Sequence, residues 1–437
     1  MKIREILLLV LIICVGAFVH LVHTGKLTFD GDWETGGIGW GKSWSYEETQ
    51  TIEAPIPALI EVINAHGAVD IRGADQATVS LKFRKKIWRR TEKDALEVAA
   101  KLKPMIVRKS DRITISVNRD EFKKPNFETS FILVVPRNTF AEIINSYGTV
   151  TAVGLATGRI ENRHGRVDAS DIEEKLSVTS SYEDVEIAHV GADCVITAKH
   201  ADVRVSGVAG RMTVDHSYGK VTAEDGGSTG EIIGSHSEVV CRRIKGPLEV
   251  RTSYEKVSLV DVGPATVHGL HSAVTADGVD GNLKVTTSYE NVRAMDVRGD
   301  LDVEGKSVGV YGRGITAREI RIVTSYENLD LAQYSGRAEI SLAHGDAVLS
   351  PSTLEFPVEV KNIYSNIRFI WPEGDRGPFE ARSHGGEIKW GLTVPPSLNT
   401  TNGESVVKAF EDRLGKPTVV LLTTHGDIDI EETHAQK

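Results

Sequence analysis

The feature that most constrains the fold is a repeat of 17 or 18 residues between Asn145 and Ala347. Tyrosine and histidine alternate strictly at one position of this repeat, which we call the ladder. The ladder comprises Tyr147, His164, Tyr182, His200, Tyr218, His236, Tyr254, His271 and Tyr289 and, after one missed position near Val308, Tyr326 and His344. A period this short is typical of one coil of a β-solenoid, in which each coil buries its apolar face against the next.

The residues around the ladder indicate strands and turns. An aliphatic residue follows most ladder residues three positions later, and runs such as Val279-Asp-Gly281-Asn-Leu283-Lys-Val285 place a period-2 apolar pattern after a glycine. Glycine marks a turn and the alternation marks a strand. The sequence therefore predicts an all-β solenoid with rungs of about 18 residues. A coil of twice that length, with tyrosines on one sheet and histidines on the other, remains an alternative.

The side chains of the ladder are expected to point inward. Counting back by twos from Tyr289 reaches Thr287, Val285 and Leu283, and alternate residues of a straight strand share one face. We therefore expect a stacked internal column at a corner, satisfied by Ser, Thr or Asn side chains and by turn backbone. The alternative is an outward stripe that binds sugar, metal or a partner. Histidines two rungs apart would lie about 9.6 Å from each other, too far to share a metal ion, so no metal or cofactor is predicted.

The N-terminus has the pattern of a membrane anchor. Lys2 and Arg4 precede an apolar run at residues 6–22, and acidic residues follow it. This charge order predicts that residues 1–23 form an uncleaved signal anchor or transmembrane helix, with the rest of the chain outside the cytoplasm. A cleaved signal peptide, giving a secreted form, is the alternative. Residues 24–50 are rich in glycine and tryptophan and are expected to form a linker that packs its aromatic side chains against the first rung.

The regular ladder, residues 141–350, is expected to be flanked by less regular modules. Residues 51–140 should hold the N-terminal rungs and an amphipathic helix from Thr91 to Leu102, which would cover the open strand edge. Residues 351–437 should hold irregular rungs. Within them we expect a short helix from Ser405 to Leu414 and a closing pair of strands from Thr418 to Ile430.

Composition limits the partners and the redox chemistry. The formal net charge is −10, and no long basic run occurs, which argues against nucleic acid as a partner. The repeat contains Cys194 and Cys241, which occupy different parts of the coil, so we expect no disulfide between them.

Two formal motif matches do not have the expected context. Gly36–Ser43 fits the phosphate-loop pattern, but a polar linker precedes it and no predicted helix follows. Gly226–Gly230 fits the Gly-x-Ser-x-Gly pattern of hydrolases, but a strand repeat continues after it, so Ser228 is interpreted as a turn residue. No catalytic residue is predicted, and the protein is expected not to be an enzyme.

The repeat also resembles a known family. Its Ser-Tyr-Glu or Ser-Tyr-Gly turns, Val-x-Gly-x-Leu-x-Val runs and N-terminal apolar segment resemble the bacterial β-strand-repeat family labelled "putative adhesin", a domain of unknown function, with a style close to the bactofilins. The resemblance spans residues 55–430, implies an envelope-associated β-solenoid and transfers no catalytic residue.

These observations together predict a non-enzymatic, membrane-tethered, extracytoplasmic adhesin or scaffold of the cell envelope. Its long side face would bind an extended partner such as a glycan or an envelope protein. The alternatives are an envelope-stress or signalling module, a scaffold that polymerises end to end, and a carbohydrate-binding or carbohydrate-active β-helix.

Overall fold

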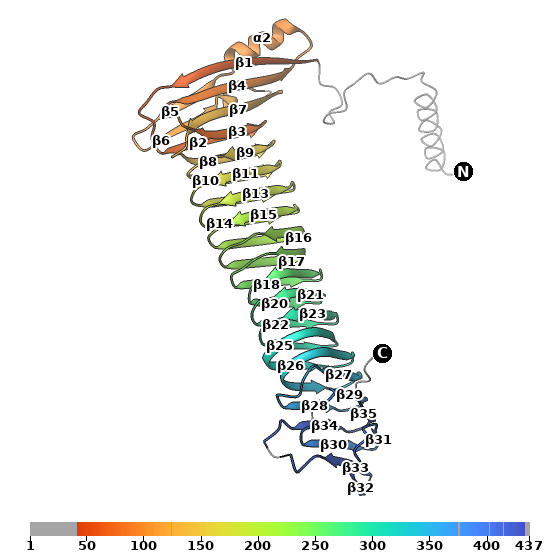
Figure 1. Ribbon diagram of the computed structural model, residues 1–437. Helices are drawn as coiled ribbons and strands as arrows, with labels where there is room; N and C mark the ends of the chain where they lie inside the picture. Colours follow the sequence, from red (N-terminus) through yellow and green to blue (C-terminus); the bar gives the residue numbers. More distant parts are fainter. Residues whose placement is uncertain (1–41, 124, 375, 402, 414, 433–437) are drawn as a thin grey trace, which may run out of the picture.

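The protein is described by a computed structural model that covers residues 42–432, apart from 124, 375, 402 and 414. Each regular coil consists of two strands, such as β12 (Leu176–Ser181) and β13 (Val185–Val190), joined at a corner. Strand β12 pairs in parallel with β14 (Cys194–Lys199), with Leu176 opposite Cys194. The coil therefore has 18 residues, which confirms the predicted rung and excludes the longer coil. Figure 1 shows the coils stacked along one axis.

The two strands of each coil belong to two parallel sheets that face each other. The first sheet contains, besides β12 and β14, β2 (Leu59–His66), β8 (Phe140–Tyr147), β10 (Thr157–His164), β18 (Leu248–Ser253), β20 (Ala265–Leu270), β22 (Leu283–Ser288), β24 (Leu301–Lys306) and β28 (Val358–Asn362). The second contains, besides β13, β3 (Val69–Ala74), β9 (Val150–Val153), β11 (Val167–Ile172), β15 (Val203–Val208), β19 (Val257–Val262), β21 (Val274–Val279), β23 (Asn291–Val297), β27 (Ala347–Pro351) and β29 (Ile367–Trp371).

Four longer strands contribute to both sheets. They are β16 (Met212–Glu224), β17 (Gly230–Arg242), β25 (Gly309–Thr324) and β26 (Leu329–Leu342). Two of them, β16 and β17, run round the corner within a coil, whereas β25 and β26 connect one coil to the next.

The core is a narrow layer of aliphatic side chains between the two sheets. In one coil, Val178 from β12 and Val185 and Ile187 from β13 are each at most 1% exposed. Their equivalents in the next coil stack directly on them, because the rungs pair in register. A single coil could not bury these residues, so each rung is stabilised by its neighbours.

The N-terminal end is closed by a small extension of both sheets. Strands β6 (Arg112–Val117) and β7 (Phe127–Pro136) pair in parallel with the first rung, and three antiparallel strands and a 3-10 turn complete the module. These are β1 (Ser43–Ile52), β4 (Val79–Trp88), β5 (Pro104–Arg108) and η1 (Arg119–Glu121). Because β1 begins at Ser43, the prediction of a linker up to residue 50 is wrong for its last part.

The predicted capping helix is present as α2 (Glu92–Lys101). The hydroxyl of Thr91 accepts a hydrogen bond from the backbone N–H of Asp94, which caps its first turn. Ala95 and Ala99 are buried. The helix packs on β4 and β1 at the N-terminal end of the stack (Figure 1).

The predicted membrane anchor at residues 1–23 lies outside the described residues. Among the residues that the structure describes, no helix has the length and apolar character needed to cross a bilayer.

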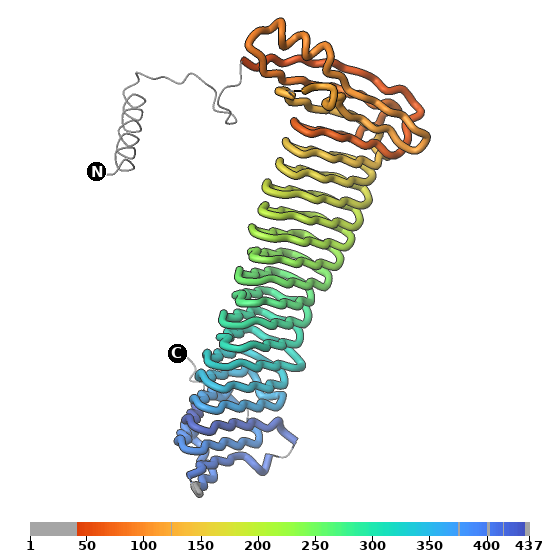
Figure 2. Tube along the Cα trace, turned by 180° about the vertical axis from the view of Figure 1, so that it is seen from behind, coloured from red at the N-terminus to blue at the C-terminus, as the bar shows by residue number. Residues whose placement is uncertain are grey.

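The C-terminal rungs do not follow chain order. The last strands, β34 (Val419–Thr423) and β35 (Ile428–Glu432), lie between the rung of β28 and β29 and the rung of β30 (Phe379–His384) and β31 (Ile388–Trp390). The closing strands predicted from Thr418 to Ile430 are therefore present, but as two arms of one coil. Figure 2 shows this end from behind.

The prediction of a short helix from Ser405 to Leu414 is wrong. The segment contains β33 (Glu404–Ala409), which pairs antiparallel with both β30 and β32 (Ser397–Thr401). Val406 and Val407 are β-branched, and pairing on both sides satisfies the strand backbone, so tertiary contacts override the helical pattern.

Candidate functional site: the aromatic ladder

The tyrosine and histidine rings form a stack along one corner of the solenoid, interrupted once between Tyr289 and Tyr326. Centroids of neighbouring rings lie 4.4–5.6 Å apart, and their planes differ by 5–20°. Three residues of the less regular rungs, His66, Tyr364 and His425, join the stack at its two ends. Tyr364 contacts His425 because the C-terminal coil is inserted between two earlier ones.

The ladder lies outside the core, so the expectation of an internal column is wrong. The six tyrosine residues of the ladder, from Tyr147 to Tyr326, are 47–58% exposed. At most corners the ladder residue itself has a positive φ, for example 72° at Tyr182 and 53° at His200. This left-handed conformation interrupts the alternation of the strand and turns the side chain outward.

Some corners place the left-handed residue one position later. After His164 and Tyr147 the following residues, Gly165 and Gly148, have φ values of 156° and 116°. A Cβ at Gly165 would lie 2.1 Å from the carbonyl oxygen of Gly148, so glycine is required where these two corners approach each other.

A second, buried column lies two residues before the ladder. Its polar members are Asn64, Asn145, Asn162, Ser180, His216, Thr252, Thr287, Thr324, Asn362 and Thr423. Thr287 Oγ1 donates to the carbonyl of Ser272 at 2.7 Å, and Asn162 Nδ2 donates to the carbonyls of Gly165 at 2.7 Å and Gly148 at 3.0 Å. The predicted Ser, Thr and Asn partners therefore exist, but they satisfy the turn backbone and not the ladder rings.

His216 belongs to this inner column and was not singled out by the sequence. It is 1% exposed, its Nε2 lies 2.7 Å from the carbonyl of Ala201, and its Nδ1 lies 2.8 Å from Ser237 Oγ. Burial lowers the pKa of the imidazole, so the neutral form donates from Nε2. No spacing signal marked it, because the position two residues before the ladder varies between coils, with Ser, Thr or Asn in some and Ala198, Gly234 or Leu342 in others.

A second left-handed position recurs in the other strand of each coil. It is occupied by Gly154, Asp171, His189, Gly207, Asp225, Arg243, Asp261, Gly278, Asp296, Gly314 and Gln333. Arg243 Nε contacts Asp225 Oδ1 at 2.7 Å, which links two neighbouring rungs on the surface. The sequence analysis missed this position, although recurring Asp and Gly at the repeat spacing are a signal for left-handed backbone.

The described residues offer little chemistry for catalysis. Among them, no group of three or more His, Cys, Asp or Glu residues is placed to hold a metal ion. Both described cysteines are free and buried, and burial raises the pKa of the Cys194 and Cys241 thiols to about 12, which suppresses the reactive thiolate. Ser228 lies in the turn between β16 and β17, whereas the phosphate-loop match at residues 36–43 falls mostly outside the described residues.

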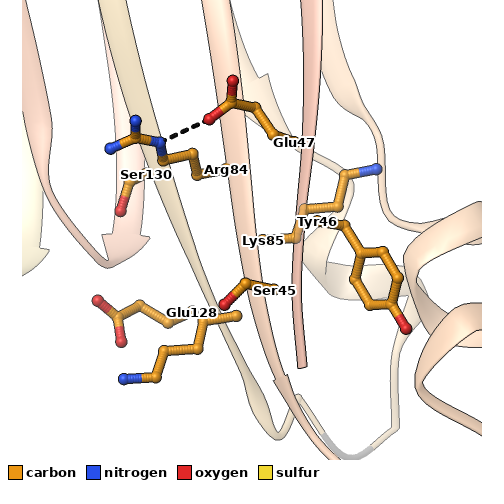
Figure 3. Close-up of a pocket in the computed structure, with 8 residues that line it drawn as sticks. Ser45, Tyr46, Glu47, Arg84, Lys85, Glu128 and Ser130 are labelled. Atoms are coloured by element: carbon orange, nitrogen blue, oxygen red, sulfur yellow. Dashed lines mark hydrogen bonds and ion pairs between the residues drawn. The ribbon is translucent and has the colours of Figure 1, made fainter. Parts of the chain in front are cut away.

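A shallow hollow of about 290 Å³ lies on the N-terminal module (Figure 3). It is lined by side chains from β1, β4 and β7, including Glu47, Arg84, Glu128 and Ser130. Glu47 Oε2 accepts a hydrogen bond from Arg84 Nε at 2.8 Å, and this contact and Lys82 lower the pKa of the carboxyl. The charge of Glu47 is therefore compensated within the module.

These features define a two-sheet parallel β-solenoid with an external aromatic ladder. No family model and no curated protein matches the chain. Among solved structures, a "putative cell adhesion protein" from Clostridium sporogenes is 9% identical with a TM-score of 0.16, over 89% of this chain and 100% of that one. A "putative adhesin" from Parabacteroides distasonis is 14% identical with a TM-score of 0.24, over 63% of this chain and 97% of that one.

These likenesses are too weak to define the family or the function of this chain. Neither solved structure is described as a bactofilin, so that part of the resemblance has no support.

Proposed function

We propose that this protein is a non-enzymatic, adhesin-like interaction protein or scaffold of the bacterial envelope, tethered through residues 6–22 with its solenoid outside the cytoplasm. The observation that carries the proposal is the exposed ladder, which repeats the same ring contacts along one corner at a single rung spacing. A surface of this kind suits an extended partner, because successive rungs can repeat one contact along its length.

The ladder would recognise its partner by ring edges. Stacking covers the faces of the inner rings, so tyrosine hydroxyls and imidazole nitrogens form its outer surface. Exposed carboxylates, such as Glu183 and Glu255, follow several of the tyrosines. An envelope glycan or an extended protein segment, each rich in hydrogen-bonding groups, fits this chemistry better than an apolar partner.

The non-enzymatic part of the proposal is supported by the protonated thiols and by the compensated Glu47. The signalling and carbohydrate-active alternatives gain no specific support from the described residues.

Binding can be tested by co-sedimentation of the detergent-solubilised full chain with bacterial cell-wall material freed of membrane, so that the proposed tether does not hold the protein in the pellet. A ladder variant carrying Tyr182→Ser, Tyr218→Ser and Tyr254→Ser should lose at least tenfold in retention. A matched variant at the other left-handed position, Asp225→Ser, Asp261→Ser and Asp296→Ser, should stay within twofold of the original chain. Circular dichroism would check that both variants retain the fold. Equal retention of all three proteins would contradict the proposal.

The tether can be tested separately by membrane fractionation of the full chain. The protein should remain with membranes in concentrated salt and be released by detergent, because an apolar helix is held by the hydrocarbon core and not by charge. Release by salt alone would refute the tether and leave the binding experiment valid.

A further inference from the structure

The ladder lacks one ring, at Ser307. Strand β24 pairs with β22 with Lys306 opposite Ser288, so Ser307 occupies the rung after Tyr289. The backbone N–H of Ser307 donates to Ser325 Oγ at 3.4 Å, which places it one rung before Tyr326. Its φ is 55°, the same left-handed conformation as in its ladder neighbours. The corner is therefore intact, and only the ring that the alternation assigns to it, an imidazole, is replaced by a hydroxymethyl group.

The missing ring leaves two tyrosine faces without a ring partner. Tyr289 stacks on His271 at 5.0 Å on one side, and Tyr326 stacks on His344 at 4.6 Å on its far side. No ring contact joins Tyr289 to Tyr326 within the described part of the chain. Two rung spacings separate the residues by about 9.6 Å, so one more planar ring completes the stack at the spacing found elsewhere.

The charges beside this slot favour a cationic ring. Glu290 and Glu327 directly follow the two tyrosines, are exposed, and make no ion pair with any other described residue. Lys306, also exposed, directly precedes Ser307, so the residues next to the slot in the sequence carry two carboxylates and one ammonium group. Tyrosine faces also attract cations through the negative potential of the ring.

We propose that the slot between Tyr289 and Tyr326 is a binding site for one imidazole ring, either free or as the histidine side chain of a partner chain. The size of the ring follows from the ladder, which inserts imidazole between tyrosines at every neighbouring rung. This inference rests on the ladder geometry alone and is independent of the proposed envelope function.

The first test places a histidine side chain of the protein itself in the slot. Imidazole binding to the full chain is measured by saturation-transfer NMR for the original protein, Ser307→His and Ser307→Ala. The original protein and Ser307→Ala should bind imidazole with similar millimolar affinity, whereas Ser307→His should bind at least tenfold more weakly. Ser307→His should also raise the Tm, by about 1–2 °C, because the added ring stacks on both tyrosines.

Two results of this experiment would overturn the proposal. One is the absence of binding to the original protein, and the other is unchanged binding to Ser307→His. The charge of the ligand is tested with the double variant Glu290→Gln and Glu327→Gln at acidic pH. A lower affinity of this variant for imidazole supports the cationic form of the ligand. No change on this substitution rejects that form.

The two sources of the ring are distinguished by a blocked tripeptide, Ala-His-Ala. Binding at least tenfold tighter than that of imidazole, and lost in Ser307→His, would assign the slot to the histidine of a partner chain. Binding equal to or weaker than that of imidazole would assign it to the free ring. If neither compound distinguishes Ser307→His from Ser307→Ala, the site does not exist.

Discussion

Where a coil contributes to both columns, its inner polar residue lies two positions before its ladder residue, yet the two residues meet opposite environments. Thr287 is 4% exposed and hydrogen-bonded to a turn carbonyl, whereas Tyr289 is 56% exposed and stacked on a neighbouring ring. The difference arises because the ladder residue Tyr289 itself has a left-handed backbone conformation, with a φ of 62°. The comparison teaches that the inner column holds the turn together, while the outer column is free to serve recognition.

The largest expected effect is at the inner column. Asn162→Leu removes the side-chain donor to the carbonyl of Gly165 and one of the two side-chain donors to the carbonyl of Gly148, which keeps Asn145 Nδ2. Losing these hydrogen bonds should lower the free energy of unfolding by about 3 kcal/mol. Urea unfolding would measure it, with the exposed Arg163→Gln on the same strand as the control. A loss no larger than that of the control would show that the inner column is dispensable.

A smaller effect is expected at the outer ladder. Tyr218 stacks on His200 at 4.9 Å and on His236 at 5.1 Å. Tyr218→Ala removes both contacts and should cost about 1 kcal/mol, because stacked aromatic pairs at the surface contribute modestly. Tyr218→Phe keeps the ring and should stay within about 0.5 kcal/mol of the original chain. A loss above that of Asn162→Leu would reverse the assignment of the two columns.

The smallest effect concerns pH and separates His216 from the ladder histidines. Burial lowers the pKa of His216 in the folded protein, so the unfolded chain binds a proton more readily. The stability contributed by neutral His216 is complete above its unfolded pKa of about 6.5 and is lost as pH falls below it. Linkage limits the loss to less than about 1 kcal/mol between pH 7.5 and pH 6.

This pH effect can be measured by urea unfolding at both pH values. His216→Asn should reduce the pH dependence, and the partly buried His66, whose pKa burial also lowers, should account for part of the remainder. A pH dependence that is unchanged in His216→Asn would contradict the assignment.

The same corner explains how far the sequence could predict the structure. The rungs follow from the spacing of apolar residues such as Val185 and Val203, which pair directly. The direction of the ladder could not be predicted, because tyrosine and histidine do not mark a positive φ as glycine does. Counting by twos is valid only along a straight strand, and the chain turns at the ladder residue.

The arrangement of the C-terminal strands depends on long-range contacts, which a local sequence pattern does not reveal. A strand such as β34 can pair with any rung of matching width, so its place between β28 and β30 is decided by packing. For the same reason, β33 pairs as a strand although its sequence also fits a short helix.

That inserted coil has a consequence for synthesis on the ribosome. Most rungs can dock as soon as they emerge, because each pairs with a rung already made. Strands β30 and β31 pair with the main stack only through β34 and β35, which are translated after them. This end of the solenoid therefore closes only after β34 and β35 have emerged, and a nascent chain stopped before Val419 would carry about forty residues that have no rung to pair with.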